Sequence, residues 1–218
     1  MIQQHLHRLS TPRAAALAGV LFAVLFGVAI TLIRRALPEG DTPGSQWAVD
    51  GSTEIRLAST LMPFAGIAFL WFIGVVRDGF GRYEDKFFAS VFLGSGLLFL
   101  AMVFASMSVG MALAHSSTHV SDPGARTEVV EFGAMLLVAL SKTYAIRMGA
   151  VFMISLATIW LKTGLMPRWL VWGTYVMAVA LLVAADVSLW LALVFPLWVL
   201  VVSLLLFARS DQARHLDR

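Results

Sequence analysis

The apolar residues of this chain lie in long unbroken runs bounded by charged or polar segments, and they do not alternate with polar residues. A helix needs about 20 mostly apolar residues to cross roughly 30 Å of hydrocarbon, whereas a barrel strand would show alternation. The pattern therefore predicts an all-α, polytopic transmembrane helix bundle with about six spans. Their expected ranges are 14–33, 56–76, 87–114, 143–162, 169–185 and 188–207.

Two of the predicted helices are longer than a bilayer is thick. The third runs from Phe87 to Ala114, and an unbroken helical pattern continues from Glu128 to Thr163, which is about 54 Å of helix. Residues 128–142 would then form an extension that precedes the fourth span. We expect the third and fourth helices to be extended on the outer side, as a helical hairpin. The alternative is that 128–142 lies in the membrane interface as an amphipathic helix.

Prolines, tryptophans and one short loop predict local features. Pro63 and Pro196 should kink their helices. Only Asp186 and Val187 separate the last two runs, which predicts a tight helical hairpin. Five tryptophans fit anchoring at the membrane interfaces, with packing inside the bundle as the alternative. They are Trp160, Trp169, Trp172, Trp190 and Trp198.

Composition agrees with a single transmembrane domain covering residues 1–218. The chain is 59% hydrophobic and 13% charged, with a mean hydropathy of +0.83, so it has too little polar surface to cover a soluble globule. Lipid is therefore its expected solvent. The chain contains no cysteine, which excludes disulfides, thiol nucleophiles, iron–sulfur clusters and c-type haem attachment.

The charges predict an orientation. The segments on the same side as the termini contain ten basic and five acidic residues, whereas the other side contains six basic and eight acidic ones. This excess predicts cytoplasmic N- and C-termini. Arg34 and Arg35 are exceptions, which we expect to reach the outer interface by snorkelling. The pI near 9.7 then follows from topology, and the expected neighbour is the lipid bilayer, with no nucleic acid.

Catalytic motifs are not found. The sequence has no phosphate-binding loop, no GxGxxG, no HExxH and no CxxC. Ser95 lies in a Gly-Ser-Gly segment similar to that of intramembrane serine proteases, but no histidine lies within a predicted span to activate it. The same lack of histidine argues against b-type haem. We therefore expect no cofactor and no catalytic residue, and the chain is less readily interpreted as an enzyme than as a non-enzymatic protein.

Ionisable residues near the outer face are candidates for a ligand or ion site. Arg147 is expected about one turn inside the fourth span, where an ionisable group is a functional hypothesis by default. Asp186 is its first expected partner, and Arg56 would compete for the same carboxylate. The alternatives are that Arg147 snorkels or forms a structural ion pair, and that Asp186 caps the last helix.

A second candidate site lies at the tip of the expected outer hairpin. His115 and His119 are four residues apart, and Glu128 and Glu131 are three apart, so each pair shares one helix face. A turn over 120–127 would bring the pairs together, and their nitrogen and oxygen ligands suit Zn²⁺. The alternative is that they are solvated residues on an exposed tip, with the two pairs rotated away from each other.

Two segments in the C-terminal third show a resemblance. They are RMGAVF at 147–152 and KTGLMPRWL at 162–170. This part of the chain resembles uncharacterised multi-span membrane proteins of actinobacteria and other bacteria. The resemblance implies a bacterial plasma membrane location, and it implies no activity or catalytic residue.

Two classes of function remain. The favoured one is a non-enzymatic accessory, scaffold or partner-binding membrane protein, as a homo-oligomer or with another protein. The alternative is a small transporter, channel or sensor that uses the outer polar cluster. A hydrated path to the middle of the membrane would favour transport, and a dry packed bundle would favour the first class.

Overall fold

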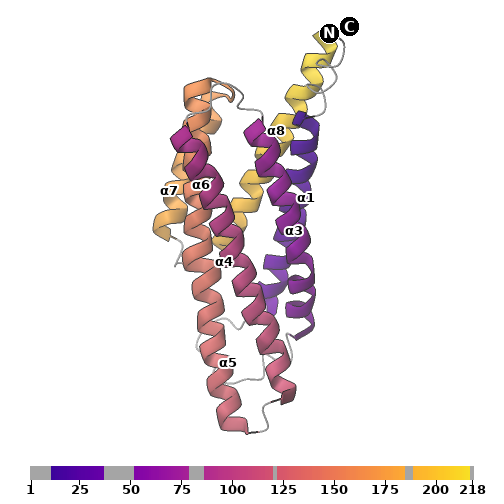
Figure 1. Ribbon diagram of the computed structural model, residues 1–218, viewed down its shortest axis with the longest axis vertical. Coiled ribbons are helices and arrows are strands. Elements are labelled where there is room, and N and C mark those ends of the chain that lie inside the picture. Colours follow the sequence, from indigo (N-terminus) through magenta and orange to yellow (C-terminus); the bar gives the residue numbers. More distant parts are fainter. Residues whose placement is uncertain (1–10, 37–51, 79–85, 120–121, 185–188, 217–218) are drawn as a thin grey trace.

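The computed structural model describes residues 11–36, 52–78, 86–119, 122–184 and 189–216, and nearly all of them are helical (Figure 1). The described residues include no β-strand, so the prediction of an all-α fold is confirmed. The elements are α1 (Thr11–Ala36), α3 (Ser52–Asp78), α4 (Lys86–His119), α5 (Pro123–Val138), the π-helix η2 (Ala139–Ala145), α6 (Ile146–Thr163), α7 (Arg168–Ala184), the 3₁₀-helix η3 (Leu189–Leu193) and α8 (Val194–Leu216).

The helices have the lengths and compositions of a multi-pass membrane protein. Five helical stretches are long and apolar enough to cross a bilayer, and α7, with 17 residues, is a shorter apolar helix. The five stretches are Ala16–Ala36, Ser52–Asp78, Lys86–His115, Gly124–Thr163 and Trp190–Ala208.

The helices form an incomplete ring. Around it, α8 packs on α1, α1 on α3, α3 on α4, α4 on α6, and α6 on α7. The start of α1 and the end of α8 lie at the same end of the bundle (Figure 1). The ring is open between α7 and α8, because α7 packs against α6 and α8 packs against α1. The turn between α7 and α8 lies outside the described residues, so the tight hairpin stays a prediction.

Phenylalanine side chains fill the middle of the bundle. The central rings come from five helices and are each at most 2% exposed: Phe22, Phe69, Phe99, Phe152 and Phe195. Phe72 of α3 and Phe92 of α4 are as fully buried. The ring centroids of Phe22 and Phe69 are 4.6 Å apart, those of Phe69 and Phe152 are 5.2 Å apart, and those of Phe99 and Phe195 are 4.6 Å apart. Tilted and edge-on aromatic contacts at these distances are favourable. The cluster therefore joins α1, α3, α4, α6 and α8 in the interior of the bundle.

The expected hairpin of the third and fourth helices is present, and its second helix begins earlier than the sequence indicated. Gly124–Thr163 is one continuous helix of 40 residues, about 60 Å long, and its first part packs against α4 beyond the ends of the other helices (Figure 1). The interfacial alternative is therefore wrong. The helix starts at Pro123 and not at Glu128, because Asp122 caps it: the Asp122 Oδ2 accepts from Ala125 N at 2.8 Å.

A π-helix joins the projecting α5 to the embedded α6. It occupies Ala139–Ala145. Beside it the Leu137 carbonyl accepts two hydroxyl hydrogen bonds, one from Ser106 on α4 at 3.1 Å and one from Ser141 at 2.7 Å. Leu137 and Ala145 are buried, whereas Tyr144 is 57% exposed. The wide turn thus moves the buried face of the helix by about one residue.

Pro196 lies near the start of its helix. Pro196 is the third residue of α8 and follows the 3₁₀-helix η3. A helix start tolerates proline, since N–H groups there have no partner within the helix.

Trp160 and Trp198 are buried and pack on each other, with centroids 6.1 Å apart. The side chains of Trp169, Trp172 and Trp190 are exposed, as interfacial anchors would be.

Candidate functional site

The predicted ligand site is described only in part. Arg147 is half-buried in the first turn of α6, and its Nη1 donates to the Thr143 carbonyl at 3.0 Å. Arg56 is exposed on α3, and the described contacts do not join it to Arg147. Asp186 lies outside the described residues. The pairing of Arg147 with Asp186 therefore stays a prediction.

The paired arginines at the end of α1 lie at the end of the bundle from which the hairpin projects. The Arg34 guanidinium carbon lies 5.5 Å from the centroid of the Trp190 ring, which is a cation–π contact. Arg35 is exposed. Ala36, Ile55 and Ala114 form a small buried cluster at the same level, which brings the end of α1, the start of α3 and α4 together. Beyond this level α4 and α5 continue as a pair.

The predicted metal site has the expected antiparallel hairpin. His115, Glu128 and Glu131 are all exposed, and the face of α5 toward α4 is made by Val130 and Gly133. The His115 Nδ1 lies 2.8 Å from the Met111 carbonyl of its own helix. The described side chains include no group of three or more that could hold a metal ion. The side chain of His119 is outside the description, so the four-residue site stays a prediction.

The hairpin has its own small core. Leu113 on α4 and Val130 on α5 are buried in a cluster separate from the main one. Gly133 lies directly under Leu113: a Cβ built on Gly133 would be 3.0 Å from the Leu113 Cγ and closer still to one of its methyl groups. The two helices can therefore approach this closely only because residue 133 has no side chain.

A second face of α5, about 100° around the helix axis from the face that packs on α4, is an apolar stripe that the sequence analysis missed. Val129 is 46% exposed, Phe132 66% and Leu136 38%. Their spacing of three and four residues puts them on one helix face. Glu128 is exposed beside them. We call these three apolar residues the α5 seam. The spacing of these residues was visible in the sequence, but 128–142 was interpreted as an extension of the fourth span or as an interfacial helix, and neither interpretation predicted a surface for a partner.

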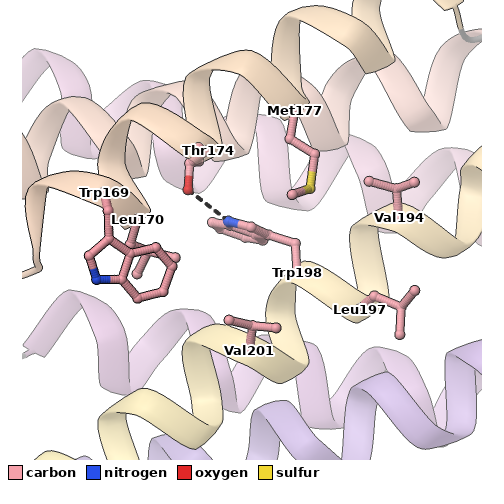
Figure 2. Close-up of a pocket in the computed structure, with 9 residues that line it drawn as sticks. Trp169, Leu170, Thr174, Met177, Val194, Leu197, Trp198 and Val201 are labelled. Atoms are coloured by element: carbon pink, nitrogen blue, oxygen red, sulfur yellow. Dashed lines mark hydrogen bonds between the residues drawn. The ribbon is translucent and has the colours of Figure 1, made fainter.

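A second feature missed by the sequence analysis is an apolar cleft of about 330 Å³ between α7 and α8, shown in Figure 2. Trp169, Gly173 and Met177 line its α7 side, and Leu197 and Val201 line its α8 side. The Trp198 indole lies between the helices, and its Nε1 donates to the Thr174 Oγ1 at 2.9 Å. This is the opening in the helix ring.

Over the part of the chain that the structure describes, the buried residues include no charged one. The fully buried polar side chains of this part are serines and one threonine, each hydrogen-bonded within the bundle: Ser95, Ser106, Ser155, Thr174 and Ser203. An enclosed cavity of about 20 Å³ lies beside Ser106 and Ser141, which is room for about one water molecule.

No family model, curated protein or solved structure matched this chain. The class of protein is therefore defined by the fold itself, an all-α helix bundle with the apolar helices of a multi-pass membrane protein.

Proposed function

We propose that this chain is a non-enzymatic membrane protein that binds a protein partner through the α5 seam on its projecting hairpin. The observation behind the proposal is that Val129, Phe132 and Leu136 are exposed on a helix that extends past the rest of the bundle. Large apolar side chains gathered on one face outside a bilayer are typical of an interaction surface. Spacing of three and four residues suits a helical partner.

The charge beside the seam favours one kind of partner. Glu128 is exposed next to it, so a helix with lysine or arginine at the flanking position would be matched electrostatically. In a parallel pair of two copies, the position facing Glu128 would be Gly133, which offers no charge. A different protein with a basic, apolar helix therefore fits better than a second copy of this chain.

The alternative of a transporter or channel has less support. Five buried phenylalanine rings from α1, α3, α4, α6 and α8 contact one another in the bundle interior, which leaves little room for a solute path there. Charged residues are absent from the fully buried set within the described ranges. Transport sites near the middle of a membrane normally need polar side chains or broken helices with free backbone groups.

We place the protein in the bacterial plasma membrane with both termini in the cytoplasm and the hairpin outside. The excess of basic residues on the side of the termini supports this orientation, as does the common location of the ends of α1 and α8 (Figure 1). The resemblance of the C-terminal third to bacterial multi-span proteins supports the location.

Photo-crosslinking in native membranes tests the proposal. A crosslinking amino acid replaces Val129, Phe132 or Leu136 in turn, and all three positions should give an adduct with the same protein. The control position is Ala112, which is exposed on α4, and it should give none. Leu136→Glu should abolish the adduct formed from position 129, because a charge in the seam would have to be desolvated.

Two results would count against partner binding. Lipid adducts alone at all three positions would mean that the seam lies in the bilayer. Flux of an ion through proteoliposomes containing the purified protein, abolished by substitutions in the bundle centre but not in the seam, would favour the transporter class.

A further inference from the structure

We infer that the cleft between α7 and α8 binds an acyl chain of a membrane phospholipid. This site is independent of the hairpin, so the inference goes beyond the proposed partner binding and is tested separately from it.

The cleft offers nothing to a polar ligand. Its walls are apolar side chains, and the Trp198 Nε1 and Thr174 Oγ1 satisfy each other at 2.9 Å (Figure 2). A polar molecule would lose its hydrogen bonds to water and gain none. Water itself is disfavoured, because an ordered water needs two to four polar partners. The occupant must therefore be a hydrocarbon.

The cleft is open to the medium around the bundle. Trp169 and Leu197 line it and are largely exposed, at 63% and 58%. Both helices are apolar, and α8 is long enough to span a bilayer. The opening therefore faces lipid, and the nearest hydrocarbon is the acyl chain of a neighbouring phospholipid.

The volume distinguishes an acyl chain from a helix. The lining on α7 extends from Trp169 to Met177, which is about 12 Å along the axis. A helix about 10 Å wide would need roughly 900 Å³ over that length. An alkyl chain, whose carbons pack at about 3.5–4.0 Å from their neighbours, needs only about 200–250 Å³. The available volume of about 330 Å³ holds the alkyl chain, whereas a helix would have to lie partly outside the cleft.

Gly173 keeps the cleft open. A Cβ at this position would meet no atom within 4 Å, so a larger side chain there would extend into the cleft. Gly74 on α3 is a matched control, because its Cβ would also meet nothing and the residue is exposed on another face. Gly173→Leu should therefore fill the cleft, and Gly74→Leu should leave it unchanged.

The experiment uses the full chain reconstituted in phosphatidylcholine vesicles that contain phosphatidylglycerol with a diazirine in the middle of one acyl chain. After detergent has removed loosely held lipid, irradiation and peptide mapping measure the label. We expect the peptides 169–177 and 194–201 to contain several times the label found on the outward face of α1. Gly173→Leu should lower cleft labelling roughly tenfold, which corresponds to about 1.4 kcal/mol of binding free energy.

Three results would overturn the inference. These are equal labelling of the cleft and the α1 face, unchanged labelling in Gly173→Leu, and labelling by a diazirine fatty acid but not by the phospholipid. If Gly173→Leu does not fold, Val201→Phe fills the cleft from the α8 side and replaces it. Binding of the seam partner should be unchanged in either variant, so failure here leaves the proposed function untouched.

Discussion

Gly133 is the position at which a small change should open the hairpin without unfolding the bundle. Gly133→Leu places a Cβ 3.0 Å from the Leu113 Cγ, in a helix contact that has no spare room. Overpacking of this kind costs roughly 1–3 kcal/mol, and the better helix propensity of leucine returns up to about 1 kcal/mol. The expected net loss is about 1–2 kcal/mol, which changes an opening equilibrium about 5–30-fold.

The loss should be local. Leu113 and Val130 form a cluster separate from the main core. Strain at Gly133 should therefore destabilise the hairpin and leave the packing of the main core unchanged. Hydrogen exchange measured by mass spectrometry in detergent should accelerate by that factor over residues 111–136 and stay unchanged over 146–160. Gly94→Leu on α4 is the control, because a Cβ there meets nothing within 4 Å. Equal exchange in the two variants, or faster exchange throughout the chain, would refute the reasoning.

Three further predictions concern the outer side. Asp122→Ala removes the cap on Ala125 N and should cost about 1 kcal/mol, seen as roughly fivefold faster exchange at 124–127; unchanged exchange would mean that the cap contributes nothing. Since the chain has no cysteine, Gly44→Cys should react with an impermeant maleimide outside intact cells and Arg82→Cys only after permeabilisation, and the reverse would contradict the orientation. Calorimetry of metal-stripped protein should show Zn²⁺ binding that disappears when both His115 and His119 are replaced by alanine, and no such binding would end the metal hypothesis.

The helices were predictable because burial in lipid leaves a strong one-dimensional signal. Apolar runs of about 20 residues can hardly form anything else, and charged residues mark their ends. The turn after α6 was also readable: Gly164 adopts φ 67°, and its N–H donates to the Trp160 carbonyl at 2.9 Å, as a helix-ending glycine does. The sequence also contained a signal for the early start of α5. Asp122 is a good helix cap and Pro123 is favoured in the first turn, and together these preferences outweigh the unfavourable helix propensity of Gly124.

The site features were harder to predict, because they depend on which helices become neighbours. A two-residue separation suggested that α7 and α8 pack together. In the structure α7 packs mainly on α6 and α8 mainly on α1, and the cleft lies between α7 and α8. Trp198 could equally have been an interfacial anchor until its bond to Thr174 placed it inside. The π-helix has no obvious sequence signal, since its residues would fit an ordinary α-helix.

The π-helix also sets the direction in which the hairpin faces. One residue in an α-helix corresponds to a rotation of about 100°. The extra residue in the wide turn at Ala139–Ala145 therefore rotates the side-chain faces of α5 relative to those of α6. Deleting one residue there would restore a regular helix and turn the α5 seam about a quarter of the way around the axis of α6. A length change of one residue in this segment would therefore redirect the outer surface while leaving the composition of every face intact.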